Sequence, residues 1–411
     1  MFHFRGKPAI IAEEVETLDP IQSGRDLHSS PRKEKVQPEA EWTVLVYGAG
    51  DNNLDRYNIS EYQDIEKAGM PSGVNFVLQW DRGKHEETPL WPWQGCKRFL
   101  LRHGSPGFEE LQDLGQVDMA SPQNLSDFVA WGMKKCPSRH TMVVIKDHGH
   151  AWEGVIDDDS HKGPMSLPDL EKALEAAEKE TGKKPDILAF DACGMANADV
   201  VMELEDRAGY LVASEKVMYA PAFPYEETFS SHGNKPFKIS PGDLASRLVE
   251  ESKKRPKQVD SLTALDLSRV KTFTHALDAF AEEVSRDKED HRTIRTFLTT
   301  EDWTFSRNSD LSRILKEVAA SPEIRSSRLK EKAKEALNAL AGMTLNEHHN
   351  PECPIGGLSV PGYYNIFNGA FFGTEFARRT AWDEAMQDIT DPIARAVSIW
   401  TRLTHRLKEL I

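Results

Sequence analysis

The sequence predicts an α/β protein with a mostly parallel central sheet and a helical C-terminal extension. Short apolar segments alternate with segments of helical periodicity up to about residue 267, which is the pattern of strand–helix–strand units. Two of these apolar segments, 141–146 and 186–190, end abruptly on polar residues. Beyond residue 268 helical periodicity dominates. We therefore expect helices on both faces of the sheet, with reactive side chains beyond the carboxyl ends of its strands.

The first ordered elements are expected after a long N-terminal segment without periodicity. Residues 1–40 mix both charges with Pro, Ser and Gln, and are expected to form a mobile tail or pro-segment. A strand over 41–47, a polar turn and a helix over 55–68 should follow. Strands are then expected over 74–80 and 96–102, and the second of these should pair with the first as a hairpin.

Helix boundaries can be read from capping residues. Ser121 followed by proline favours a helix start, and Pro137 ends that helix. Gly182 should end a helix that begins near Leu167. A further helix is expected to start directly after Cys193, and a strand should follow over 210–214.

The chain is expected to divide at about residue 268. Residues 41–268 should form the α/β core, and 269–411 a mainly helical region. Within that region the pattern predicts a strand over 355–360 that returns to the sheet, and an amphipathic terminal helix over 393–410.

Composition excludes several kinds of partner. The formal charge of −15 argues against a nucleic-acid surface. No run approaches the roughly 18–20 apolar residues needed to cross a bilayer, so no membrane partner is expected. The start lacks an apolar signal region, and the four cysteines form no CxxC pair, so a cytoplasmic location with reduced thiols is expected.

Cysteine and histidine chemistry is predicted where the two apolar segments end. One ends on Asp147-His148-Gly149 and the other on Asp191-Ala192-Cys193. The positive end of a following helix would favour the Cys193 thiolate, and His148 could protonate a leaving amine. The backbone N–H groups of Gly149 and Cys193 are candidate donors to an oxyanion.

The ordered motifs of the chain resemble the clostripain family of cysteine peptidases, relatives of caspases, legumain and gingipain. The resemblance covers roughly 41–268 and rests on WTVLVYGAGDNNL, VNFVLQWDR, NLSDFVAWGMKKCP, DHGHAW, DAC and SEKVMYAPAFPY in the family's order. It implies a caspase-like αβα sandwich and an endopeptidase that needs no cofactor, with His148 as general acid/base and Cys193 as nucleophile. It also implies that Asp191 lines the S1 pocket of a peptidase that cleaves polypeptides after Arg or Lys.

Departures from the family pattern bear on specificity and activation. Pro221 stands where relatives often carry a second acid, and Glu226 or Glu227 could take its place. Relatives are often zymogens that cleave themselves between the His and Cys strands. In this chain Lys162, within SHKGP, is the candidate site of self-cleavage.

Three alternative interpretations remain at this stage. The chain could be a catalytically silent relative that binds a partner through the same groove. His148 and His150, with the acidic run and histidine over 157–161, could instead hold a divalent metal in a hydrolase, although the spacing forms no closed metal motif. The same acidic loop could bind calcium, but it lacks EF-hand spacing, and we expect no metal site.

Overall fold

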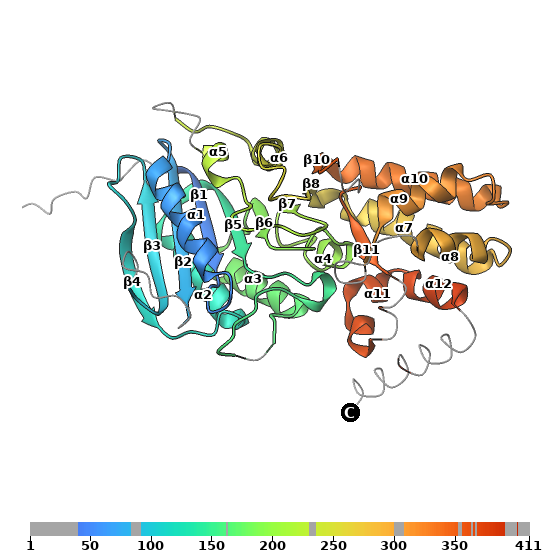
Figure 1. Ribbon diagram of the computed structural model, residues 1–411, viewed down its shortest axis with the longest axis horizontal. Coiled ribbons are helices and arrows are strands. Elements are labelled where there is room, and N and C mark those ends of the chain that lie inside the picture. The colour runs from blue at the N-terminus through green and yellow to red at the C-terminus, as the bar shows by residue number, and fades with distance from the viewer. Residues whose placement is uncertain are drawn as a thin grey trace, which may run out of the picture. The chain divides into compact units, whose positions relative to one another are not determined.

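A nine-stranded sheet organises the chain, whose computed structural model is shown in Figure 1. The structure describes residues 40–83, 92–161, 163–229, 236–299, 308–351, 356–362, 365, 368–390 and 401. The strand order in the sheet is β10-β8-β7-β6-β5-β1-β2-β3-β4. The strands are β1 Ala40–Gly48, β2 Val74–Arg82, β3 Gly95–Arg102, β4 Glu109–Gly115, β5 Ser138–Lys146, β6 Ile187–Asp191, β7 Tyr210–Ala213, β8 Ser261–Asp266 and β10 Thr344–His349.

The centre of the sheet is parallel and its edges are antiparallel. Strands β2, β1, β5, β6 and β7 pair in parallel. Strands β3 and β4 extend one edge antiparallel, and β8 and β10 extend the other. The carboxyl ends of β1, β5 and β6 therefore meet at the same edge of the sheet, as the sequence predicts.

The strands are buried on both faces, which makes the molecule an αβα sandwich. Alternate residues of β1 point to opposite sides: Val44 and Val46 pack in one apolar cluster, and Leu45 and Tyr47 in the other. One face is covered by α1 Asp55–Ala68, α5 Tyr225–Phe229 and α6 Pro241–Ser252. The other is covered mainly by α2 Pro122–Lys135, α3 Leu167–Thr181, α4 Ala198–Glu203, α7 Val270–Arg286, α9 Leu311–Ala320 and α10 Ser327–Met343. The caspase-like αβα fold is thus confirmed.

No domain boundary falls near residue 268 in the described part of the chain. Residues 39–411 form one compact unit. The C-terminal helices, which also include α8 His291–Thr299, α11 Glu375–Arg379 and α12 Trp382–Ile389, share the apolar cluster of α2, α3 and α4. Figure 1 shows α7, α8, α9 and α10 beside the β10 edge, away from β4. The helical region therefore extends the core.

The strand predicted over 355–360 does not return to the central sheet. The strand found there is β11 Ser359–Pro361, which pairs with β9 Asn308–Asp310 in a separate two-stranded sheet. The central sheet gains β10 instead, and its side chains alternate between half-buried and exposed. Such a polar strand suits the edge of a sheet but carries no apolar pattern from which it could be predicted.

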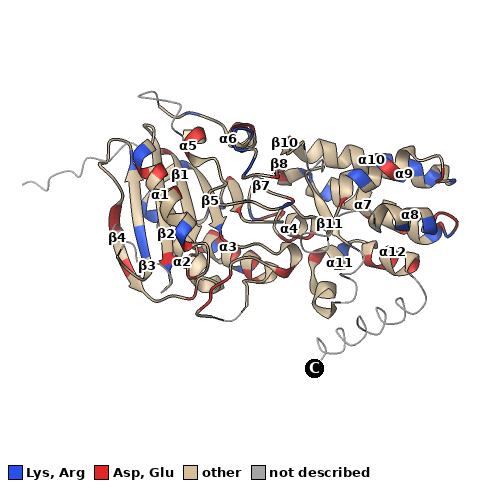
Figure 2. Ribbon diagram, in the orientation of Figure 1, with Lys and Arg blue, Asp and Glu red and all other residues tan. Residues whose placement is uncertain are grey.

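Strand β4 was also not predicted, because it is acidic and mostly exposed. Lys97 of β3 holds it through ion pairs with Glu110, at 2.9 Å, and Asp113, at 3.2 Å. In Figure 2, basic residues in blue on β3 lie beside acidic residues in red on β4. The hairpin of β2 and β3 is confirmed.

Helix α3 begins and ends as predicted. Ser166 accepts a hydrogen bond from the Asp169 N–H at its start, and Gly182 adopts a left-handed φ of 72° at its end. The tail predicted over 1–40, except Ala40, lies outside the described residues. Lys162 and nearly all of the predicted helix over 393–410 lie outside them too.

Candidate active site

The structure brings the segments that carry His148 and Cys193 side by side. Strands β5 and β6 are parallel neighbours whose pairing ends at Lys146 opposite Asp191. A Cβ atom added to Gly149 would lie 2.4 Å from the carbonyl oxygen of Cys193. Because real Cβ contacts are never so short, only glycine allows the two segments to approach this closely. The predicted meeting at one sheet edge is therefore found for the backbone.

His148 is half-buried, and its contact with Asn53 favours one tautomer. Its Nε2 lies 2.7 Å from the side-chain oxygen of Asn53, which can only accept a hydrogen bond. Nε2 therefore carries the proton, and Nδ1 is the nitrogen able to accept one. Burial lowers the pKa of His148, although the charge of Asp157 opposes this effect. The imidazole is thus neutral at neutral pH.

The loop beneath His148 is held by the turn after β1. The Asn52 amide donates to Asp147 Oδ1 at 2.7 Å and to the carbonyl of Asp157 at 2.8 Å, and its own oxygen accepts from the Leu54 N–H. Asp147 also accepts from the Asp157 N–H at 2.6 Å. Asn52 of the predicted polar turn therefore also positions the histidine, and Asn53 is a partner that was not predicted. No local signal marked Asn53, because its contact spans 95 residues.

Cys193 is half-buried against the segment after β7. The Met218 N–H donates to Sγ at 3.3 Å, and the Met218 carbonyl lies 3.7 Å from Sγ. Burial raises the pKa of the thiol, and the Met218 hydrogen bond only partly offsets this rise. The thiol is therefore protonated in this conformation. Within the described residues, neither Sγ nor the imidazole of His148 is hydrogen-bonded to the other.

The helix expected directly after Cys193 begins later. Helix α4 starts at Ala198, with the side chain of Asn197 as its cap. The intervening residues pair with the neighbouring segment instead: Gly194 N–H donates to the carbonyl of Lys216, and Ala196 N–H to that of Ser214. Gly194 adopts a left-handed φ of 71° that permits this turn. The helix dipole therefore gives Cys193 less help than predicted.

Asp191 is buried and already paired with a cation. Lys146 donates to its Oδ2 at 2.6 Å, and the Tyr225 hydroxyl lies 3.5 Å from the same atom. The ammonium of Lys146 also lies 2.5 Å from Glu61 Oε2. Burial raises the pKa of Glu61 to about 7, against the attraction of Lys146. The predicted S1 carboxylate thus belongs to an internal ion cluster.

Glu227, one substitute for the acid missing at Pro221, is also paired. Arg255 donates to both of its carboxylate oxygens at 2.8 Å, and to the carbonyl of Pro221 at 3.2 Å. Such a two-pronged pair is geometrically specific and leaves this carboxylate neutralised. Glu226, the other candidate, is exposed.

His150 bonds within its own loop. Its Nε2 lies 3.0 Å from both oxygens of Asp157, and this hydrogen bond raises the pKa of His150. In the acidic loop, Asp158 and His161 lie with Asp118 so that one ligand atom of each falls within 4.8 Å of the others. His161 pairs with Asp158 at 2.9 Å, and Asp158 also accepts from the Met119 N–H. Asp158 and His161 are thus already hydrogen-bonded within the protein.

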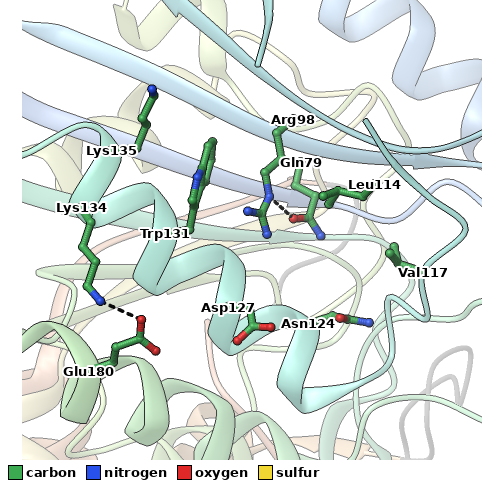
Figure 3. A pocket seen from close by; sticks show the side chains of 10 residues that line it. All are labelled: Gln79, Arg98, Leu114, Val117, Asn124, Asp127, Trp131, Lys134, Lys135 and Glu180. Carbon is green, nitrogen blue, oxygen red and sulfur yellow. Dashed lines mark hydrogen bonds and ion pairs between the residues drawn. The ribbon is translucent and has the colours of Figure 1, made fainter. Parts of the chain in front are cut away.

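A cavity of about 670 Å³ lies elsewhere, beside α2, and Figure 3 shows its lining. Arg98 donates to Gln79 at 2.8 Å, and its guanidinium stacks 4.4 Å from the centre of the Trp131 ring. None of the residues described above for the Cys–His site lines this cavity.

In the described residues, no helix is long and apolar enough to cross a bilayer.

An αβα sandwich with a cysteine and a histidine after adjacent parallel strands defines the class of caspase-like cysteine peptidases. A family model described as the clostripain family matches residues 46–343, and the chain belongs to this family. It is 22% identical over 216 aligned residues to clostripain of Hathewaya histolytica. The match covers 46% of this chain and 41% of that relative. The match thus spans less than half of the curated relative.

Two solved structures share the fold. One is an inactive zymogen C11 protease from Parabacteroides distasonis, with a TM-score of 0.63 and 17% identity. The other is a secreted C11 cysteine protease from Bacteroides thetaiotaomicron in complex with an irreversible peptide inhibitor, with a TM-score of 0.60 and 18% identity. Each match covers 84% of this chain and 99% of the other.

Proposed function

We propose that the chain is a cysteine endopeptidase in which Cys193 is the nucleophile and His148 the general acid/base. The observation that carries this proposal is the contact of the two strand-end segments at Gly149. Membership of the clostripain family supports it. The chemistry requires only a thiol, a base and oxyanion donors, and no metal takes part in it.

The reaction proceeds in two steps. Sγ of Cys193 attacks the peptide carbonyl carbon while His148 takes the thiol proton, and the N–H groups of Gly149 and Cys193 stabilise the oxyanion. His148 then gives this proton to the leaving amine as the C–N bond breaks, which leaves a thioester. Water activated by His148 hydrolyses the thioester and regenerates the thiol. Asn53 supports these steps by holding the tautomer whose Nδ1 accepts the proton.

Activation by proteolysis is part of this proposal. The described conformation has a protonated thiol that is bonded to Met218, and no Cys–His hydrogen bond, as expected of a zymogen. The loop between β5 and β6 has exposed residues on both sides of Lys162. We place self-cleavage after Lys162.

The preference for Arg or Lys at P1 is a separate hypothesis. It follows from the resemblance and depends on the carboxylate of Asp191. The ion pair with Lys146 weighs against it, because the carboxylate already has a cationic partner. Intact Cys193 and His148 favour an enzyme over the alternative, a silent relative that binds partners.

The proposal is tested by peptide hydrolysis before and after nicking of the loop by trypsin, which is then inhibited. We expect cleavage that falls at least about 1000-fold in Cys193→Ala, because the nucleophile is lost. Cys136→Ala is the matched control, since Cys136 is buried and lies outside the site. A nicked, folded wild type without Cys193-dependent cleavage would support the silent relative.

A further inference from the structure

A buried ion cluster of Glu61, Lys146 and Asp191 lies behind the candidate nucleophile. Its members come from α1, β5 and the end of β6, and no side chain in it is more than 4% exposed. The ammonium lies within 2.6 Å of an oxygen of each carboxylate. Buried charges at these distances hold one another in place, because removing one leaves another without compensation.

The cluster lies close to the candidate nucleophile. Asp191 and Cys193 are two residues apart, and Cys193 and Tyr225 pack against the same apolar cluster on one side of the sheet. Tyr225 in turn contacts Asp191, and the charge of Asp191 acts on the thiol. The P1 side chain leaves the carbon next to the attacked carbonyl, and we therefore take its far end to approach this group.

The charges of the cluster disfavour an acidic P1 side chain, and the ammonium of Lys146 weakens the attraction of Asp191 for a basic one. A basic side chain would meet the ammonium of Lys146, which already lies 2.6 Å from Asp191 Oδ2. An acidic side chain would meet two carboxylates. In a site screened from water these repulsions are stronger than at the surface.

We propose that Lys146 determines the P1 specificity. Its ammonium occupies the position beside Asp191 that a substrate cation would take, so the enzyme prefers uncharged P1 side chains over Arg and Lys. This inference rests on the proposed peptidase function and names a specificity for the same site. It also predicts that replacing Lys146 with a neutral residue exposes Asp191 to a basic P1 side chain.

The test uses peptides that differ only at P1, with Leu, Ala, Arg, Lys or Asp, and compares kcat/KM among variants of the full chain. In Lys146→Met, the ratio of basic to uncharged P1 should rise roughly tenfold or more, as one new hydrogen bond between charged groups allows. Lys146→Arg keeps the cation and should keep the wild-type ratio. The double variant Lys146→Met/Asp191→Asn should lose the gain.

Asp191→Asn alone keeps the test decisive if Lys146→Met fails to fold, because Lys146 retains Glu61 as its partner. We expect this variant to keep the wild-type ratio of basic to uncharged P1. A wild type that already prefers Arg and Lys, and loses that preference in Asp191→Asn, would overturn the role of Lys146 and leave the peptidase intact. Cleavage that persists in Cys193→Ala would instead overturn the proposed function.

Discussion

At the scale of single residues, burial acts in opposite directions on the pKa values of the two groups proposed to react, Cys193 and His148. It raises the pKa of the Cys193 thiol above its ordinary value of 9.0 and lowers that of His148 below 6.5. Between those two values both groups are uncharged. A thiolate–imidazolium pair would have the reverse order of pKa values. In the described conformation the thiol of Cys193 is therefore of low reactivity.

This order of pKa values predicts the pH dependence of alkylation. In the uncut chain, the rate at which iodoacetamide modifies Cys193 should rise only as the pH approaches and passes 9, because the thiolate is the reactive form. Peptide mapping by mass spectrometry measures this rate at each pH. Cys96, whose thiol is buried, serves as an internal control. A plateau of fast alkylation near pH 6 would contradict the prediction, since it would reveal a preformed ion pair.

At the scale of elements, the site depends on how closely the ends of β5 and β6 approach. Gly149 is in direct contact with the backbone of Cys193, and Met195 lies 3.0 Å from the position of an added Cβ. The sequence predicts both strands and their reactive ends because each signal is local. The partners Asn53, Lys146 and Met218 could not be assigned, since their contacts join residues 25 to 95 positions apart.

Gly149→Ala should therefore damage both stability and activity. The added methyl group would push the two strand ends apart, at a cost of about 1–3 kcal/mol in the free energy of unfolding. The rate of peptide hydrolysis should fall as well, because the Cys–His geometry opens. Urea denaturation and a peptide assay measure the two effects.

Gly342→Ala is the matched control for this substitution. Gly342 lies in α10 with open space around its Cβ position, so alanine should stabilise the helix by about 0.5–1 kcal/mol. Equal effects of the two substitutions would show that the Gly149 contact has no special role.

At the scale of the whole molecule, a cut in the loop after β5 would not separate two independent halves. Strand β5 lies before Lys162 and β6 after it, yet the two are neighbours at the centre of the sheet. Both apolar clusters contain residues from each side of the cut. The chain should therefore remain one folded unit after processing.

Processing at Lys162 should thus yield two fragments that elute together. We expect the wild type to cut itself slowly. Cleavage is possible without a selective S1 pocket because the loop is tethered to its own active site and is presented there at high effective concentration. Lys162→Ala and Cys193→Ala should both remain intact on denaturing gels. Size-exclusion chromatography should show the wild-type fragments co-eluting until denaturant is added. Fragments of equal yield in Cys193→Ala would assign the cut to another protease.

The sequence by itself determined the parallel centre of the sheet, its αβα layers and the two residues proposed to carry the chemistry. Apolar strands that end on His148 and Cys193 are local signals, and the parallel topology then brings their backbones together. Only the tertiary structure decided the state of the site. It placed Lys146 on Asp191, Asn53 on His148 and Met218 on Cys193, and it added the polar strand β10 to the sheet. These contacts depend on which distant side chains share a buried volume, and charge and burial there set each group's pKa and partner.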